Sequence, residues 1–209
     1  MAWSPRSNQL AWLKAAVFAL CLVPFGRLIY GSAANTLGAN PIETITRSTG
    51  WWTLFLLMVT LAVTPVRRWT TANWLVRLRR MLGLFAFFYA SVHLLTFVWF
   101  DHWFDVAAIL KDVVKRPFVT VGFAAYLLLL PLAFTSTHAM VRRLGRNWQR
   151  LHRLIYVIAT LGVVHFWWLV KRDITEPLVF AGVLVLLLGV RLYWRLRDTR
   201  RRMTPVASA

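Results

Sequence analysis

Acidic residues are scarce in this chain, which has 7 Asp and Glu against 25 Lys and Arg. Charged residues of both signs make up only 15% of its 209 positions, while 59% are hydrophobic and 12 are tryptophan. A soluble domain of this length needs more charge to cover its surface. The deficit of charge therefore excludes an ordinary soluble protein and predicts an integral membrane protein with one compact domain.

Cysteine is almost absent as well. The one cysteine, Cys21, lies inside an apolar run, so neither a disulfide nor a thiolate metal cluster can form within the chain. The sequence also lacks a G-x-G-x-x-G motif and predicts no nucleotide-binding domain. The chain therefore cannot take hydride from NAD(P)H through a domain of its own.

Six apolar runs approach the length of a membrane span. They are roughly Trp12–Tyr30, Gly50–Val66, Met81–Phe100, Phe118–Thr137, Leu154–Val170 and Pro177–Trp194. At about 1.5 Å per residue each can cross a hydrocarbon core of roughly 30 Å, and only helices satisfy the backbone there. We predict an all-α integral membrane bundle of six transmembrane helices. This domain covers residues 12–195, between an N-terminal segment, 1–11, and a basic tail, 196–209, that is expected to be disordered.

The basic residues concentrate in alternate loops. Pro65–Arg80 and Ser136–Arg153 each contain five arginines and no acid, and the C-terminal segment from Arg195 onward contains five arginines against Asp198. The positive-inside rule predicts that these loops and both termini are cytoplasmic. A net charge of +18 is also typical of nucleic-acid binders, but here the basic residues lie between apolar runs, so we expect contact with membrane lipid and no nucleic acid.

The first apolar run has an alternative interpretation. A basic start, an apolar stretch and the small residues GSAA at 31–34 are compatible with a cleaved signal peptide. Pro24 and Arg27 interrupt the stretch, however, and a retained helix places the N-terminus with the other basic segments. We therefore favour a retained first span. No internal repeat is apparent along the chain.

Two histidines lie at matching depth in the third and fifth predicted helices. His93 is 13 positions beyond Arg80, which closes a basic loop, and His165 is 13 positions beyond His152 at the corresponding boundary. Both imidazoles are therefore ~20 Å along their helices from the cytoplasmic edge. Equal depth on two helices that run in the same direction predicts a bis-histidine haem, with one imidazole on each face of the iron.

This histidine pair has two alternatives, a zinc site and a purely structural role. Zinc usually has three or four ligands, and no carboxylate or thiolate lies at this depth. In a structural role, each imidazole would bond a backbone carbonyl or a hydroxyl, such as that of Ser91 or Thr96. Two imidazoles at one depth favour haem, because ionisable side chains inside a membrane are usually functional.

His152 is a candidate ligand of a second haem on the cytoplasmic side. The matching position on the third helix holds Arg79 and Arg80, and arginine is a poor iron ligand but a good partner for haem propionates. Thirteen helical residues turn ~220° beyond whole turns, so His152 and His165 do not share one face of an ideal helix. Two stacked haems would need either a bent fifth helix, for example at Gly162, or macrocycles approached from different sides. The alternative is an interfacial histidine that contacts lipid phosphates.

Three other polar residues receive simpler interpretations. His102 and His138 lie in predicted loops and are expected to be solvated. Arg27, near the outer end of the first run, is expected to reach the lipid headgroups, with a haem propionate as the alternative partner.

Four long stretches resemble a known family. They are TGWWTLFLLMVTLAVTPVRR, RRMLGLFAFFYASVHLLTF, KRPFVTVGFAAYLLLLPLAFTS, and LGRNWQRLHRLIYV with VVHFWW. These stretches are similar to the ferric-reductase-like transmembrane family and, within it, to the MsrQ family, formerly called YedZ. The resemblance covers about residues 12–195.

The resemblance implies a haem-binding, multi-pass subunit of the bacterial inner membrane. Such a subunit passes electrons from the quinone pool or a flavin reductase, through b-type haem, to MsrP, a periplasmic molybdopterin subunit that reduces oxidised methionines. The resemblance places the family's haem histidines on His93, His152 and His165. It also implies that FMN is bound, but no residue of this chain can be assigned to FMN. The NADPH oxidases, whose membrane parts belong to the same wider family, carry a fourth histidine where this chain has arginine, so one haem or two remain possible.

Two further functions stay open. One is a stand-alone haem reductase of ferric iron or oxygen, and the other is a cofactor-free anchor or transporter. Transporters need ionisable or broken-helix sites near the midplane, and apart from its histidines this chain offers Pro24 and little else. No catalytic residue is assigned, because the expected role is electron transfer to a separate catalytic subunit.

Overall fold

The computed structural model describes residues 5–170 and 173–203, with side chains up to Arg200. Within these ranges the chain forms helices and no strand, and six helical stretches are long and apolar enough to cross a membrane. The predicted all-α bundle of six membrane-spanning helices is therefore confirmed. Which side of the membrane the termini face stays a prediction.

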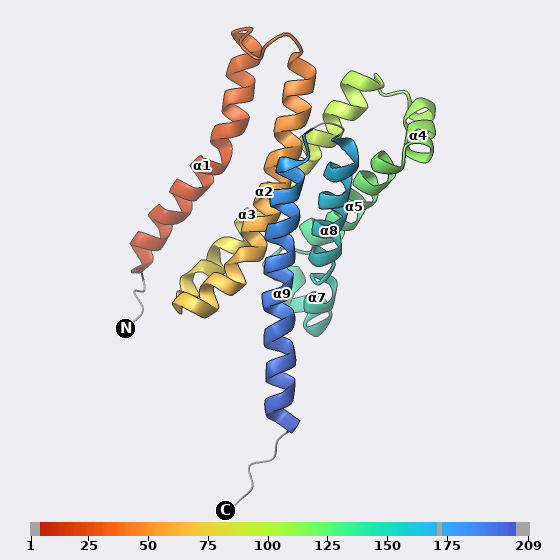
Figure 1. The fold of residues 1–209 in the computed structure, drawn as a ribbon. Coiled ribbons are helices and arrows are strands. Elements are labelled where there is room, and N and C mark those ends of the chain that lie inside the picture. Colours follow the sequence, from red (N-terminus) through yellow and green to blue (C-terminus); the bar gives the residue numbers. More distant parts are fainter. Residues whose placement is uncertain (1–4, 171–172, 204–209) are drawn as a thin grey trace, which may run out of the picture.

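The helices are numbered in chain order (Figure 1). They are α1 (Ser7–Ala33), α2 (Pro41–Thr70), η1 (Asn73–Leu75), α3 (Val76–Thr96), η2 (Phe97–Asp101), α4 (Val106–Lys115), α5 (Pro117–Phe134), α6 (His138–Leu144), α7 (Arg146–Leu151), α8 (Leu154–Leu169) and α9 (Thr175–Met203). The short helices α4, α6 and α7 form in segments that we expected only as loops. α9 continues to Met203, so part of the predicted disordered tail is helical; residues 204–209 lie outside the described ranges.

Local chemistry explains where two of the spans differ from the apolar runs. α2 begins nine residues before Gly50 because the Asn40 side chain caps it, accepting the Glu43 N–H at 3.2 Å, and Pro41 starts its first turn. α5 ends at Phe134, three residues before the predicted end, where the Thr135 hydroxyl folds back onto the Pro131 carbonyl at 2.5 Å.

The centre of the bundle consists of two packed helix pairs. α2 packs along α3, α5 packs along α8, and α9 lies against both α2 and α8. The most buried side chains come from α2, α3 and α8 and include Leu61, Tyr89 and Ile158, each at most 1% exposed. Each of the two pairs contributes one of the histidines predicted to lie at matching depth.

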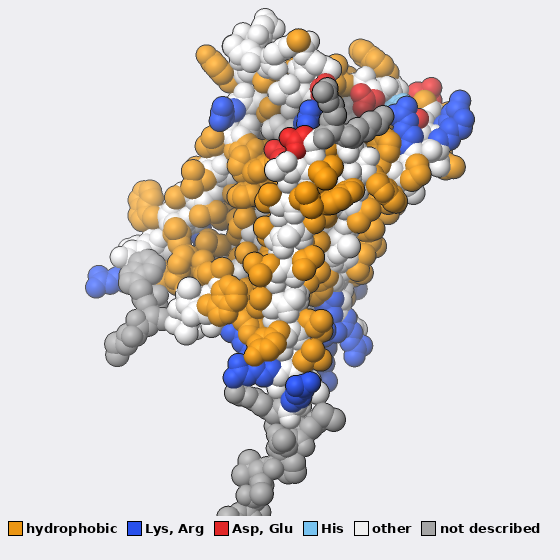
Figure 2. Space-filling view, in the orientation of Figure 1, with side chains coloured by type: hydrophobic (Ala, Val, Ile, Leu, Met, Phe, Trp, Pro, Cys, Tyr) orange, Lys and Arg blue, Asp and Glu red, His pale blue; other side chains and the backbone are white. Residues whose placement is uncertain are grey.

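The two ends of the bundle carry different charges. The first residues of α1 and the last of α9 lie at the same end (Figure 1), which we call the basic end because the arginine-rich segments 67–80 and 142–153 are there. Figure 2 shows an apolar belt between the Lys and Arg side chains of this end and the mixed acidic and basic side chains of the opposite end. This distribution is that of a membrane-spanning protein.

α1 is held to the bundle by the side chain of Tyr89 on α3. Pro24 lies inside α1, and next to it the Tyr89 hydroxyl donates to the Cys21 carbonyl at 2.7 Å and accepts the Phe25 N–H at 3.1 Å. The hydroxyl thus replaces the helical bond between these two backbone groups. Because no water reaches such groups in lipid, this insertion satisfies both of them where the helix is interrupted.

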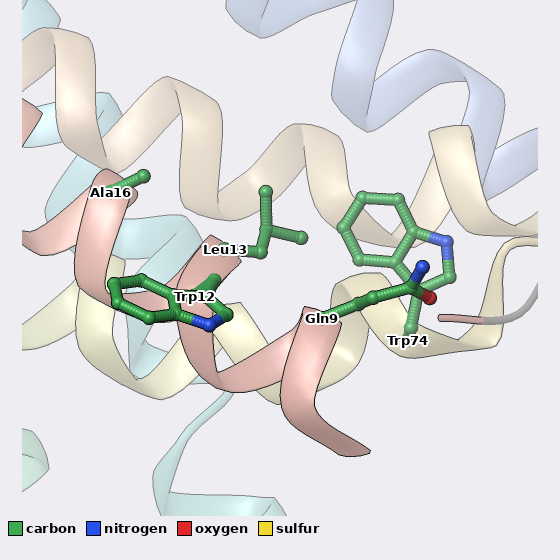
Figure 3. Close-up of a pocket in the computed structure, with 5 residues that line it drawn as sticks. All are labelled: Gln9, Trp12, Leu13, Ala16 and Trp74. Carbon is green, nitrogen blue, oxygen red and sulfur yellow. The ribbon is translucent and has the colours of Figure 1, made fainter. Parts of the chain in front are cut away.

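An open hollow of about 490 Å³ separates the start of α1 from η1 (Figure 3). It is lined by Gln9, Trp12, Leu13, Ala16 and Trp74. Trp12 is 78% exposed, as expected for a tryptophan in the interfacial region of a membrane.

Candidate functional site

His93 on α3 and His165 on α8 face one another inside the bundle. Their ring centroids are 6.2 Å apart and their planes cross at 79°. A metal–nitrogen bond is about 2 Å and a ring nitrogen lies about 1 Å from the ring centre, so two imidazoles on opposite sides of one metal have centroids about 6 Å apart. The structure thus brings together the two histidines whose depths match in the sequence, at a spacing that suits two axial ligands.

A backbone carbonyl fixes the tautomer of each imidazole. His93 Nδ1 lies 2.9 Å from the Thr46 carbonyl oxygen, and His165 Nδ1 lies 2.7 Å from that of Phe118. A carbonyl only accepts, so both Nδ1 atoms carry the proton and both Nε2 atoms keep a free lone pair. Metal-bound histidines usually have this arrangement, because the second bond orients the ring and raises its basicity.

The two hydroxyls named for a structural role are engaged elsewhere. The Ser91 hydroxyl bonds the Phe87 carbonyl and the Tyr126 hydroxyl, and the Thr96 hydroxyl donates to the main-chain carbonyl of His93. Ser91 and Thr96 therefore do not hold the imidazoles. Each ring instead bonds a backbone carbonyl of a neighbouring helix, the other partner that a structural role allows, and the Thr49 hydroxyl lies 3.5 Å from His93 Nδ1.

Two glycines make room for these rings, and sequence reasoning missed them. A Cβ atom at Gly50 on α2 would lie 3.0 Å from His93 Cε1, and one at Gly122 on α5 would lie 2.7 Å from His165 Nδ1. Any other residue at either place would push the imidazole away. Each glycine lies four residues after the carbonyl that holds the ring, so one turn of α2 or α5 supplies both the space and the hydrogen bond.

The two halves of the site repeat one another along the chain. In each half, 47 residues separate the carbonyl from its histidine, and the glycine precedes the histidine by 43 (93 − 50 and 165 − 122). An offset of 72 residues therefore maps one half onto the other. The apolar residues around the two halves differ, so comparison of residue identities does not reveal this repeat. The equal spacing of each glycine from its histidine is the signal that could have identified Gly50 and Gly122.

His152, at the basic end, also has its Nδ1 next to a backbone carbonyl. Its Nδ1 lies 3.1 Å from the Trp148 carbonyl and its ring stacks on the Trp148 indole at 3.9 Å. Nε2 is buried with the Leu132 carbonyl nearby but makes no hydrogen bond of normal geometry in the described part of the chain. The indole N–H donates to the Thr135 carbonyl on α5 at 3.0 Å, which anchors the stack. A buried nitrogen without a partner is costly unless a ligand engages it.

The surroundings of His152 refine the sequence prediction. α7 ends at Leu151 and α8 begins at Leu154, so the regular helix is interrupted at His152 and Arg153, while Gly162 lies inside an uninterrupted helix. The ~220° argument assumed a regular helix through these two residues, which this interruption removes. Arg79 is half-buried, whereas Arg80 is exposed. That an arginine opposes His152 stays a prediction.

The remaining polar residues lie apart from these three histidines. His102 Nε2 lies 3.2 Å from Asp112 Oδ2, and their side chains are only 11% and 18% exposed. The expectation that His102 is solvated was therefore wrong, because η2 and α4 enclose it. His138 is exposed, as expected, and Arg27 is exposed on α1.

The donor set limits what the paired histidines can bind. In the residues that the structure describes, no group of three or more His, Cys, Asp or Glu could hold a bare metal ion. Two opposed imidazoles with free Nε2 atoms instead suit a metal that brings its own equatorial ligands, as a porphyrin does. The residues present thus fit a haem. Their role as ligands stays a prediction.

Comparisons with known proteins agree with this site. The family described as "Ferric reductase like transmembrane component" matches residues 49–163, a segment that contains His93 and His152. Proteins named "Protein-methionine-sulfoxide reductase heme-binding subunit MsrQ" are similar over nearly the whole chain. The one from Herminiimonas arsenicoxydans is 57% identical, covering 93% of this chain and 90% of its own, and that from Ralstonia nicotianae is 54% identical, covering 93% and 91%.

A third relative of the same name, from Xanthomonas campestris pv. campestris, is 51% identical over 96% of both chains. Sequence identity above 50% over nearly whole chains implies a shared arrangement of the helices, and not only shared hydrophobicity. The chain therefore belongs to the MsrQ family, within the ferric-reductase-like transmembrane proteins.

Proposed function

We propose that this chain is a haem-binding subunit that passes electrons across the bacterial inner membrane to a periplasmic methionine-sulfoxide reductase. The observation that carries the proposal is the pair His93 and His165, with centroids 6.2 Å apart and each Nδ1 on a backbone carbonyl. Bound haem supplies one-electron redox chemistry. The names of the relatives, which include a haem-binding role and the methionine-sulfoxide reductase system, support the same assignment.

His93 and His165 would hold a b-type haem through their free Nε2 atoms. Thr46 and Phe118 orient the rings, and the surrounding apolar helices exclude water, which lets buried dipoles and ligand basicity set the redox potential. His152 would ligate a second haem, opposite Arg79, through its buried Nε2, which makes no hydrogen bond of normal geometry in the described structure. FMN belongs to the proposal through the family resemblance alone.

The direction of electron flow follows from the proposed topology. With the basic end in the cytoplasm, electrons enter there from quinol or a flavin reductase and leave at the opposite end. The acceptor we propose is MsrP, the molybdopterin subunit. It would dock near α4, whose exposed apolar residues Val106, Leu110 and Val114 recur every four positions and form one face of the helix.

An optical spectrum of the purified protein in detergent tests the central claim. We expect split α and β bands on reduction, loss of these bands in His93→Ala or His165→Ala, and an altered but persistent haem signal in His152→Ala. A colourless protein, expressed with haem supplied, would overturn the proposal. Reoxidation by purified MsrP, compared with reoxidation by ferric iron or oxygen, separates the subunit from a stand-alone reductase.

A further inference from the structure

Arg191 is a charged residue within the sixth membrane span, and its environment is unusual. Its Nη1 donates to the Leu187 carbonyl at 2.9 Å, its Nη2 donates to the Leu61 carbonyl on α2, and its guanidinium lies over the Tyr156 ring, 5.7 Å from the centroid. The guanidinium is therefore enclosed by α2, α8 and α9. Backbone carbonyls and an aromatic face bind it, but they do not neutralise its charge.

The side chain points away from the nearest lipid headgroups. α9 runs toward the basic end, and Leu187 lies one turn farther from that end than Arg191. Leu61 precedes Arg68 by seven residues on α2, which places its carbonyl about 10 Å deeper than the arginine at the interface. A snorkelling arginine extends the opposite way. The phosphates of the membrane surface therefore do not explain the orientation of Arg191.

No acid is available to pair with this arginine. Six of the seven acidic residues precede α9 or lie in its first turn, toward the opposite end, and the seventh, Asp198, is bound to Arg68 at 3.4 Å. A guanidinium within a membrane span, without a carboxylate from the chain, requires an anion from elsewhere.

We propose that Arg191 forms an anion-binding site beside His152, and that its ligand is the carboxylate arms of the cofactor that His152 coordinates. Tyr156, one turn after His152 on α8, links the two parts of this site because its ring lies under the Arg191 guanidinium. Guanidinium forks bind carboxylates in a bidentate manner. The inference rests on the second haem of the proposed function and names the residues that hold its propionates.

The experiment compares Arg191→Gln and Arg191→Lys with Arg195→Gln, an exposed arginine one turn along the same helix. We expect Arg191→Gln to weaken retention of the His152-dependent haem at least tenfold and to move its midpoint to lower potential, because a positive charge near the macrocycle is lost. Arg191→Lys should be intermediate and Arg195→Gln unchanged. The His93- and His165-dependent spectrum, intact in every variant, shows that the protein is folded.

Haem with both propionates converted to methyl esters identifies the ligand group. The wild type should bind the ester at the second site at least tenfold more weakly than haem, whereas Arg191→Gln should bind both alike. Equal binding of haem by the wild type and Arg191→Gln would overturn the inference alone. Loss of a bound phospholipid from that variant, seen by native mass spectrometry with haem retained, would assign the site to a lipid phosphate instead. A wild type without any His152-dependent haem would refute the second haem of the proposed function together with this inference.

Discussion

Gly122→Ala is the sharpest perturbation of the paired histidines, because it adds one methyl group directly against His165. The new Cβ would lie 2.7 Å from Nδ1 and 2.8 Å from Cε1, whereas ordinary contact begins at 3.4 Å. The ring must therefore retreat by about 0.7 Å (3.4 − 2.7). A displacement of this size exceeds the roughly 0.5 Å within which a site must be held.

The displacement also weakens the hydrogen bond to Phe118 that orients the ring. Mutations that disturb such a supporting bond typically lower metal affinity by about 10–100-fold, which corresponds to about 1.4–2.8 kcal/mol. We expect a loss of haem affinity in this range for Gly122→Ala, measured by titrating haem into the apoprotein in detergent and by the reduced-minus-oxidised spectrum. Gly50→Ala should lose less, because its Cβ would lie 3.0 Å from the nearest ring atom of His93.

Gly83→Ala on α3 is the matched control. Its Cβ would meet only Thr60 Cγ2, at 3.9 Å, so haem binding should be unchanged and the helix stabilised by up to about 1 kcal/mol. If Gly122→Ala bound haem with the affinity and spectrum of Gly83→Ala, the imidazole of His165 would not be held against α5, and our account of the site would be wrong.

Three further perturbations test other parts of the structure. Tyr89→Phe should destabilise the protein by only about 1 kcal/mol in thermal unfolding in detergent, because the two backbone groups of α1 that lose the hydroxyl can pair with each other; a loss above about 3 kcal/mol would show that they cannot. Trp148→Leu keeps the carbonyl that holds His152 but removes the stacked indole, so the His152-dependent haem signal should weaken while the His93- and His165-dependent signal stays. Equal loss of the two signals would contradict separate sites. Arg68→Gln removes both an exposed ion pair with Asp198 and the contact of the guanidinium with the Trp194 ring, and should shift stability by less than about 2 kcal/mol; a larger shift would mean that these contacts join α2 to α9 more tightly than their exposure indicates.

The comparison of sequence and structure shows where local patterns suffice. Hydrophobic runs of bilayer length predicted all six spans, because the membrane forces backbone groups to bond within each helix regardless of what packs around it. Equal spacing from the basic loops predicted that His93 and His165 meet, because a helix converts residue number into depth at a fixed rise. The short helices α4, α6 and α7 were missed, since they lie in loops where neither constraint applies.

The sequence by itself thus determined the class of the protein, the six spans and the depth of the two paired histidines. Only the tertiary structure decided what surrounds those histidines: the carbonyls of Thr46 and Phe118, the space at Gly50 and Gly122, and the interruption that sets His152 apart from α8. Depth is a one-dimensional property that a helix fixes locally. Hydrogen bonds and clearance between helices depend on rotation and lateral packing, which arise only when residues 47 positions apart come into contact.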